Sequence, residues 1–363
     1  MTELPAGRRR VVTVGERTKW AWAGVLLVVL LALLDNTSTV QSTFVGLTVV
    51  GPFLAAVGVG PVRTALVGGY AVLVAGILLV GDGLSLGSPA HTLRVLALAA
   101  GCALAVWVAE QRVRREAALA RIQLVAEAAQ RAILRAVPAR AGAIAFAARY
   151  QSAAEESRVG GDMYEVADSP HGVRVLVGDV RGKGLEAVQL TSLVLGSFRE
   201  AAFLHADLVE VAQGMANSTA RNVGPEDFVT AVLLELREDQ LTVVNCGHLA
   251  PLLLPMDGEP GELTAPITTP LGLSPEPRAR QLTWEVGDRL LLYTDGLAEA
   301  RDRRGTFFPL STAVRLCGDR GKPLAACADE LLTAVALHVG GRLNDDLAFV
   351  LLERVADTPD PAT

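Results

Sequence analysis

The stretch Leu176–Ala187 reads L-V-G-D-V-R-G-K-G-L-E-A, and it decides how the second half of the chain is interpreted. The apolar run over residues 173–177 predicts a strand that delivers Asp179 at its end. Gly178 just before Asp179, and Gly182 and Gly184 in the turn that follows, remove Cβ atoms, so a ligand can approach the backbone closely. A carboxylate at a strand end beside a glycine-rich turn suits a metal ion, a phosphate group or both.

Three further stretches place aspartates at strand ends or beside glycines. Arg289–Thr294 is a buried-strand pattern that ends in Asp295-Gly296, and Asn344-Asp345-Asp346 opens an apolar strand over 347–352. Upstream, Val159-Gly160-Gly161-Asp162 supplies a fourth glycine-flanked aspartate. Carboxylates so far apart in sequence could meet only in a folded site. Oxygen ligands without a His or Cys cluster favour Mg²⁺ or Mn²⁺ over zinc.

The composition divides the 363 residues into an apolar part and an ordinary globular part. The chain is 51% hydrophobic but only 5% aromatic, with a net charge of −6 and a mean hydropathy of +0.37. Such an apolar chain suggests a membrane portion, and the negative charge gives no reason to expect nucleic-acid binding. The four cysteines show no C-x-x-C spacing, so neither a zinc site nor a disulfide framework is expected.

The N-terminal third is expected to be a four-helix membrane domain over residues 1–109. Its four apolar segments are near the length of about 20 residues that crosses a bilayer, and they are Trp20–Leu34, Val40–Gly60, Val62–Val80 and Thr92–Ala109. Basic residues precede the first segment, separate the second from the third and follow the fourth. The positive-inside rule therefore predicts a multi-pass protein of the cell membrane, with the N-terminus and the rest of the chain in the cytoplasm.

Residues 110–137 predict a linker helix, because they are charged, rich in alanine and free of Gly and Pro up to Pro138. An apolar stripe at spacings of three and four comprises Leu119, Ile122, Ala126, Ala129, Ile133 and Ala136. Two interpretations stay open at this point. The stripe either pairs two protomers in parallel, giving a homodimer, or docks on the chain's own globular domain.

Residues 138–354 have the composition of a globular domain, and residues 355–363 that of a disordered tail. Strands mostly follow strands and helices are grouped, which predicts an α+β fold with antiparallel sheets. The eight strand candidates are 145–150, 173–177, 230–236, 241–245, 252–254, 281–285, 289–294 and 347–352. The four helix candidates are 185–204, 205–222, 310–316 and 324–339.

With these residues in view, the domain resembles the metal-dependent protein phosphatases (PPM, type 2C), in their SpoIIE/RsbU-like bacterial branch. The matching motifs stand in family order: V-G-G-D-M-Y-E from Val159, V-G-D-V-R-G-K-G-L-E-A from Val177, F-V-T-A from Phe228, N-C-G-H-L-A-P-L-L from Asn245, G-D-R-L-L-L-Y-T-D-G-L-A-E-A from Gly287 and N-D-D-L-A from Asn344. The resemblance implies an α-β-β-α sandwich of two antiparallel sheets. It also implies hydrolysis of phosphoserine or phosphothreonine in proteins.

The same resemblance implies a centre of two Mn²⁺ or Mg²⁺ ions that activates water. Asp179 and Asp295 are assigned the catalytic role. The expected metal ligands are Asp162, Asp179, the Val180 carbonyl, Asp295 and either Asp345 or Asp346. Glu165 stands where the branch has Asp, and we expect it to tune the site. His248 is expected to make a structural hydrogen bond.

Two functions from different classes follow. The first is a membrane-anchored protein serine/threonine phosphatase acting on a phosphorylated regulatory protein, with an anti-anti-sigma factor as the substrate suggested by family analogy. The second is a catalytically inactive phosphatase-like scaffold that only binds such a phosphoprotein. Retention of all the metal carboxylates favours the first, because a binding module needs none of them.

Overall fold

The computed structural model of the protein describes residues 14–37, 45–81, 89–152, 160–224, 226–341, 343 and 345–356. The chain forms two compact units, Met1–Arg121 and Ile122–Thr363. The predicted tail lies outside the described residues, apart from residues 355 and 356.

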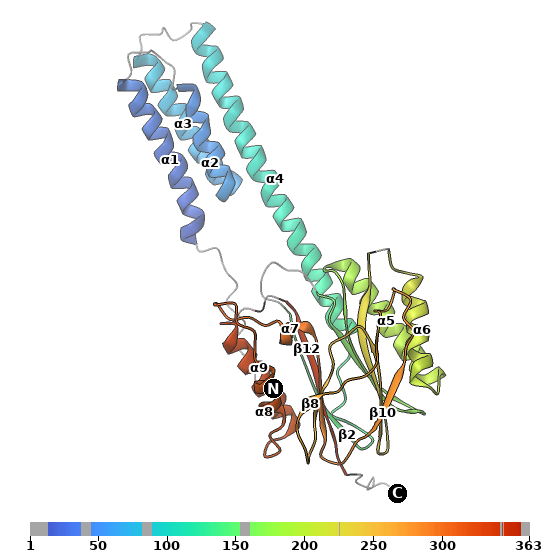
Figure 1. The fold of residues 1–363 in the computed structure, drawn as a ribbon. Helices are drawn as coiled ribbons and strands as arrows, with labels where there is room; N and C mark the ends of the chain where they lie inside the picture. Colours follow the sequence, from blue (N-terminus) through green and yellow to red (C-terminus); the bar gives the residue numbers. More distant parts are fainter. Residues whose placement is uncertain are drawn as a thin grey trace. The chain divides into compact units, whose positions relative to one another are not determined.

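The regular elements that the structure describes in the first unit are all helices (Figure 1). Its elements are α1 (Val14–Thr37), the 3₁₀ helix η1 (Val45–Val49), α2 (Val50–Gly58), α3 (Pro61–Gly81) and most of α4 (Pro89–Ile133). Small residues let α1 and α2 approach closely: a Cβ on Gly24 would lie 2.6 Å from the Gly51 carbonyl oxygen. A Cβ on Gly51 would lie 2.5 Å from Val28 Cγ2, so neither glycine has room for a side chain.

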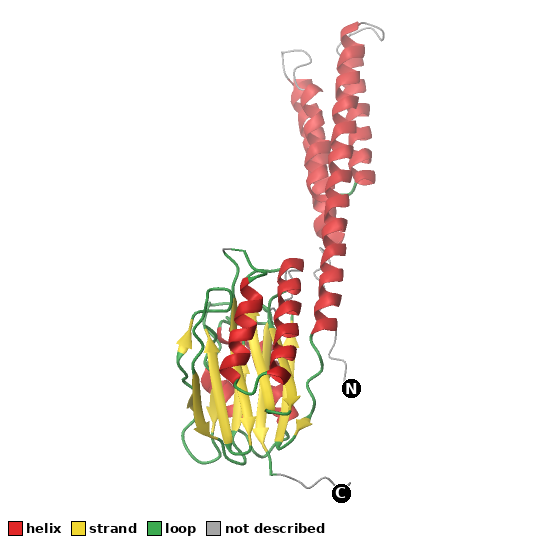
Figure 2. Cartoon of the chain, turned by 90° about the vertical axis from the view of Figure 1, so that its right-hand side faces the viewer, coloured by secondary structure: helices red, strands yellow, loops and turns green. Residues whose placement is uncertain are grey.

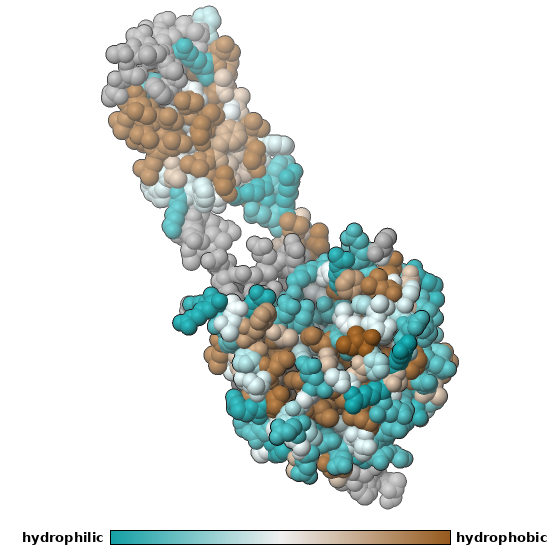
Figure 3. All heavy atoms as spheres, viewed as in Figure 1, coloured by the Kyte–Doolittle hydropathy of each residue, from teal (hydrophilic) through white to brown (hydrophobic). Residues whose placement is uncertain are grey.

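Among the described residues, two helices are long and apolar enough to cross a membrane, at Pro61–Leu78 and Thr92–Ile122. Only 28% and 22% of these windows are buried, unlike the core helices of soluble proteins. Figure 3 shows hydrophobic residues gathered over the middle of this unit on the visible face. These helices suggest membrane association.

The four predicted spans are only partly matched by the helices. The first apolar segment lies within α1, but the second gives only a short apolar helix, Gly46–Gly58. The fourth span and the linker helix are one continuous helix, α4, which ends at Ile133, four residues before the predicted end. No Gly or Pro separates the two predicted segments between Cys102 and Val137, so nothing interrupts the backbone hydrogen bonds there.

The second unit contains two sheets whose strands are almost all antiparallel (Figures 1 and 2). One sheet has the order β1-β2-β12-β11-β7-β8, with β1 (Arg140–Ala141), β2 (Ile144–Gln151), β12 (Leu347–Arg354), β11 (Arg289–Tyr293), β7 (Leu252–Leu254) and β8 (Gly261–Glu262). The other has the order β10-β6-β5-β4-β3, with β10 (Ala279–Thr283), β6 (Gln240–Cys246), β5 (Val229–Arg237), β4 (Gly172–Val180) and β3 (Met163–Ser169). The short strand β9 (Ile267–Thr268) pairs parallel to β6.

Five helices complete the unit: α5 (Leu185–Leu204), α6 (Leu208–Ala220), α7 (Asp295–Ala298), α8 (Leu310–Cys317) and α9 (Leu324–His338). Alternate residues of β4 face different cores, as strand geometry requires. Val175 and Val177 belong to the core between the sheets, whereas Leu176 packs under α5 and α6. A third core lies between the other sheet and the helices α8 and α9. The predicted α-β-β-α sandwich is thereby confirmed.

Candidate metal centre

Three of the predicted site residues meet at one end of the sandwich. Asp162, Asp179 and Asp295 each present one carboxylate oxygen, and these three oxygens all lie within 4.8 Å of one another. The topology explains the convergence of the first two, because β3 and β4 are antiparallel neighbours and Met163 lies opposite Gly178. Asp295 follows β11 in the other sheet, so the cluster bridges both sheets.

Burial and mutual repulsion disfavour the charged forms of these carboxylates. Burial, followed by the charge of Asp179, raises the pKa of Asp162 well above its ordinary value. Burial, followed by the charges of Asp295 and Asp345, raises the pKa of Asp179 to about 7. The pKa of Asp295 is raised by the same effects. A divalent cation would relieve this repulsion, and an all-oxygen donor set fits Mn²⁺ or Mg²⁺.

Gly161 makes room for the Val180 carbonyl beside Asp179. A Cβ on Gly161 would lie 2.2 Å from the Val180 carbonyl oxygen and 2.8 Å from Asp179 Oδ1. The Val180 amide donates a hydrogen bond to the Gly161 carbonyl at 3.2 Å, which fixes this close approach. The segment before β3 therefore requires glycine, and the Val180 carbonyl lies next to the cluster.

Asp345 and Asp346 have different surroundings. Asp346 is 2% exposed, and its carboxylate accepts hydrogen bonds from the Tyr150 hydroxyl at 2.5 Å, the Ser152 hydroxyl at 3.2 Å and the Gly160 amide at 2.9 Å. Asp345 is half-buried and lies 2.8 Å from Lys183 Nζ. Its charge raises the pKa of both Asp179 and Asp295. Because protein donors occupy Asp346, the surroundings favour Asp345 as the ligand.

Glu165 does not join the carboxylate cluster, so the expectation that it tunes the site is wrong. Its side chain is 6% exposed and accepts hydrogen bonds from Arg199 of α5, one of them at 2.9 Å. Alternate residues of a strand point to the same face, and Met163 and Glu165 both lie on the face of β3 that packs against α5. The Glu165 side chain therefore points toward α5 and not toward the carboxylate cluster.

His248 holds the two sheets together behind the cluster, through the expected structural hydrogen bonds. Its Nδ1 lies 2.9 Å from the Thr230 hydroxyl and its Nε2 lies 3.1 Å from the Tyr293 carbonyl. Burial lowers the pKa of His248 to about 4, so the neutral ring accepts from Thr230 and donates to Tyr293 at neutral pH. Thr230 lies opposite Asp179 in register, and Tyr293 is two residues before Asp295.

Several residues that shape the site were not singled out from the sequence. The Thr294 hydroxyl donates to Asp162 Oδ2 at 2.7 Å. Gln130 of α4 is 3% exposed and donates to the Gly160 carbonyl at 3.1 Å. The second of these contacts shows that the C-terminal end of α4 docks on the globular domain of the same chain, where Ala129 and Ile133 also pack against Val188. Gln130 lies beside the apolar stripe, and nothing in the sequence indicates that its side chain is buried against the Gly160 carbonyl.

Lys183 is expected to compete with a bound cation for Asp345. We predict that Lys183→Gln raises the Mn²⁺ affinity by up to about fivefold, because a partly exposed ion pair contributes about 0.2–1 kcal/mol. Isothermal titration with MnCl₂ measures this change. Lys322→Gln removes a comparable ion pair far along the chain, with Glu330, and should leave the affinity unchanged. A weaker Mn²⁺ affinity in Lys183→Gln would contradict the competition.

Without metal, the second unit is expected to lose stability as the pH rises. A raised folded-state pKa means that the folded unit holds more protons than the unfolded chain between about pH 4 and about 7, so stability falls across that window. We expect the melting temperature in EDTA to fall by at least about 5 °C between pH 5 and pH 8, and saturating Mn²⁺ to remove the fall. Thermal unfolding followed by Trp284 fluorescence tests this in residues 122–363. An equally steep fall in Asp179→Asn would show that other groups cause it.

Comparisons with known proteins agree with this geometry. Residues 169–355 match the family Stage II sporulation protein E (SpoIIE). The structure of the RsbU and RsbW domains of Rv1364c from Mycobacterium tuberculosis is 25% identical, with a TM-score of 0.50, over 60% of this chain and 62% of that one. The match thus spans less than two thirds of that protein. The SiaA-PP2C domain of Pseudomonas aeruginosa shares the fold at 19% identity, with a TM-score of 0.56, over 67% of this chain and 98% of that domain. The chain belongs to the SpoIIE family and is a metal-dependent protein serine/threonine phosphatase of the SpoIIE/RsbU-like type.

Proposed function

We propose that this protein is a membrane-anchored phosphatase that hydrolyses phosphoserine or phosphothreonine on a regulatory protein, using water activated by two divalent cations. The observation that carries the proposal is the meeting of Asp162, Asp179 and Asp295 within 4.8 Å. Asp179 and Asp295 act as the catalytic carboxylates. Three acidic groups that repel one another have no structural need to meet inside a folded domain.

Different residues of the chain would hold the cations, orient the ligands and fix the strand ends. Asp162, Asp179, Asp295, Asp345 and the Val180 carbonyl would hold the cations, either Mn²⁺ or Mg²⁺. When bound, two such cations lower the pKa of water and offset negative charge on the phosphoryl oxygens. The Thr294 hydroxyl fixes the orientation of Asp162. His248 keeps the strand ends that carry Asp179 and Asp295 at a constant separation.

The substrate is inferred from the family alone. Relatedness to the RsbU domain supports a phosphorylated regulatory protein, and an anti-anti-sigma factor is the substrate that family analogy suggests. A pulldown with Asp179→Asn, which should bind the phosphoprotein without turning it over, identifies the partner. Recovery of the same partner in unphosphorylated form would contradict a substrate relationship.

Mn²⁺-dependent hydrolysis of p-nitrophenyl phosphate tests the enzyme against the inactive scaffold. We expect residues 138–354 to release p-nitrophenol with Mn²⁺ and to lose activity in EDTA. No activity under any divalent cation would favour the scaffold. A phosphothreonine peptide should be hydrolysed under the same conditions.

The domain plan is part of the proposal: a membrane domain over 1–109, a linker helix over 110–137, the phosphatase domain over 138–354 and a tail over 355–363. Apolar surfaces support the anchoring, since Leu26 and Leu66 are 65% and 70% exposed on α1 and α3. Resistance to carbonate extraction from membranes tests it.

The exposed Leu119 and Ile122 of α4 support a homodimer, and a cysteine at Ile122 should cross-link two chains. No trapped dimer would leave only the docking of Ala129 and Ile133.

A further inference from the structure

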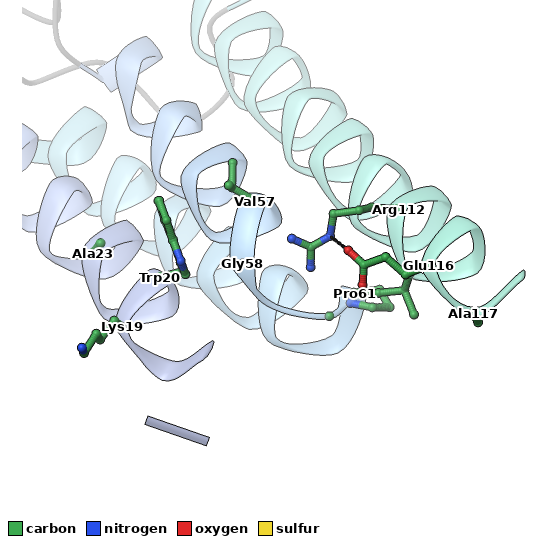
Figure 4. A pocket seen from close by; sticks show the side chains of 11 residues that line it. Lys19, Trp20, Ala23, Val57, Gly58, Pro61, Arg112, Glu116 and Ala117 are labelled. Atoms are coloured by element: carbon green, nitrogen blue, oxygen red, sulfur yellow. Dashed lines mark ion pairs between the residues drawn. The ribbon is translucent and has the colours of Figure 1, made fainter. Parts of the chain in front are cut away.

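The helical unit contains a cavity of about 1080 Å³ between α1, the turn that joins α2 to α3, and α4 (Figure 4). Its walls are partly apolar and partly charged, and the side chains that matter here are Lys19, Trp20, Val57, Arg112 and Glu116. All of these residues belong to the unit Met1–Arg121. The cavity has no part in the metal centre.

Arg112 is held so that its guanidinium points into the cavity, as Figure 4 shows. One Nη atom donates to the Val59 carbonyl at 3.0 Å, and Nε lies 3.4 Å from a Glu116 carboxylate oxygen. Arginine has five N–H donors, so these two contacts leave several for a ligand. The planar guanidinium can donate two parallel hydrogen bonds, one to each of two oxygens of a phosphate group.

The charges of the cavity favour an anion. Lys19 and Arg112 contribute two positive charges, and Glu116 contributes one negative charge. The Glu116 side chain is 61% exposed and so is largely screened by water, whereas that of Arg112 is only 29% exposed. The lining of the cavity therefore carries one net positive charge.

The surroundings also favour a lipid over a free anion. Trp20 stands where the apolar stretch of α1 begins, and α4 changes from apolar to charged after Ala109. Tryptophan beside basic residues at the end of apolar helices is typical of the membrane–water interface. Trp20 and Val57 are 42% and 58% exposed, so they offer apolar surface to acyl chains next to the phosphate site.

We propose that this cavity binds the headgroup of an anionic phospholipid, with its phosphate on Arg112 and its acyl chains against Trp20 and Val57. The proposal rests on the membrane anchoring stated above but not on the phosphatase activity. A zwitterionic lipid carries the same phosphate, but its ammonium group would add a positive charge beside Arg112, in a lining that already carries a net positive charge. The site therefore distinguishes phosphatidylglycerol from phosphatidylcholine.

Native mass spectrometry of the full chain tests the proposal in detergent micelles with equal amounts of phosphatidylglycerol and phosphatidylcholine. We expect the wild type to retain phosphatidylglycerol, and Arg112→Gln to reduce that retention by about fivefold, the effect of about 1 kcal/mol for one basic residue. Arg114→Gln is the matched control, because Arg114 lies two residues away, pairs with Glu110 and is 68% exposed. Glu116→Gln should increase retention, which a merely misfolded variant would not do.

Equal retention of the two lipids by the wild type would overturn the site, and so would equal losses of retention in Arg112→Gln and Arg114→Gln. It would also be overturned if Arg112→Gln separated a dimer of the chain although no lipid is bound to the wild type. Displacement of the signal by glycerol phosphate, without retained lipid, would identify a free-phosphate site instead and would also overturn it. Hydrolysis of p-nitrophenyl phosphate and carbonate extraction, measured on the same preparations, report separately on the phosphatase and on the anchoring.

Discussion

Asp179→Asn is expected to reduce Mn²⁺-dependent turnover of p-nitrophenyl phosphate by about 10³-fold, the equivalent of about 4 kcal/mol. The substitution keeps the size of the side chain but removes the charge that lies between Asp162 and Asp295. Asn retains one carbonyl oxygen, so weak cation binding can persist while turnover is lost. Steady-state kinetics at saturating Mn²⁺, together with titration of the cation, separate the two effects.

The matched control is Asp168→Asn, which changes an exposed carboxylate of the neighbouring strand β3. It should leave turnover within about twofold of the wild type, since it lies outside the cluster. If Asp179→Asn kept more than a tenth of the wild-type turnover at saturating Mn²⁺, the assignment of Asp179 as a catalytic carboxylate would be contradicted.

Arg174→Met is expected to lower the free energy of unfolding of the phosphatase unit by about 3–5 kcal/mol. Arg174 is fully buried and donates to Glu235 and to the carbonyls of Ala202, His205 and Ala206. These carbonyls lie at and just beyond the end of α5, where the helix leaves them without internal partners. Removing the guanidinium leaves the buried Glu235 carboxylate with the half-exposed Arg237 as its remaining ion-pair partner, and it leaves the carbonyls of Ala202 and His205 without the donors that Arg174 supplies.

Urea unfolding of residues 122–363, followed by circular dichroism, measures this loss. Arg278→Met changes an arginine whose side chain is 73% exposed and should stay within about 0.5 kcal/mol of the wild type. Arg174→Met combined with Glu235→Met should recover part of the loss, because it also removes the buried carboxylate, whose charge Arg237 alone would have to balance. A loss below about 1 kcal/mol in the single variant would mean that water enters to replace the guanidinium.

The phosphatase fold could be predicted from the sequence because its strands and helices carry strong local patterns. The helix predicted over 185–204 has the observed bounds, and the strands predicted over 230–236 and 241–245 lie within β5 and β6. Strand β3 was missed, because its sequence mixes charged and small residues that pack against α5 only after folding. Arg174 sits in an apolar strand, and only its tertiary partners make that position favourable.

The site could be predicted only as a set of carboxylates and not as a set of contacts. Spacing in the sequence placed Asp162, Asp179 and Asp295 at strand ends, and the order of the strands brings them together. Sequence alone could not distinguish Asp345 from Asp346, because the difference lies in donors from β2 and the Gly160 segment. Nor could it show that Lys183 pairs with Asp345.

The most direct test of the account is an anomalous-scattering map at the manganese edge, from crystals of residues 122–363 grown with MnCl₂. We expect two peaks roughly 3.5–4 Å apart, both within coordination distance of Asp179 and one also beside the Val180 carbonyl. Asp179→Asn crystals should lose at least one of the peaks. A map without manganese at these carboxylates, or with manganese only elsewhere on the unit, would contradict the claim that they form a two-cation centre.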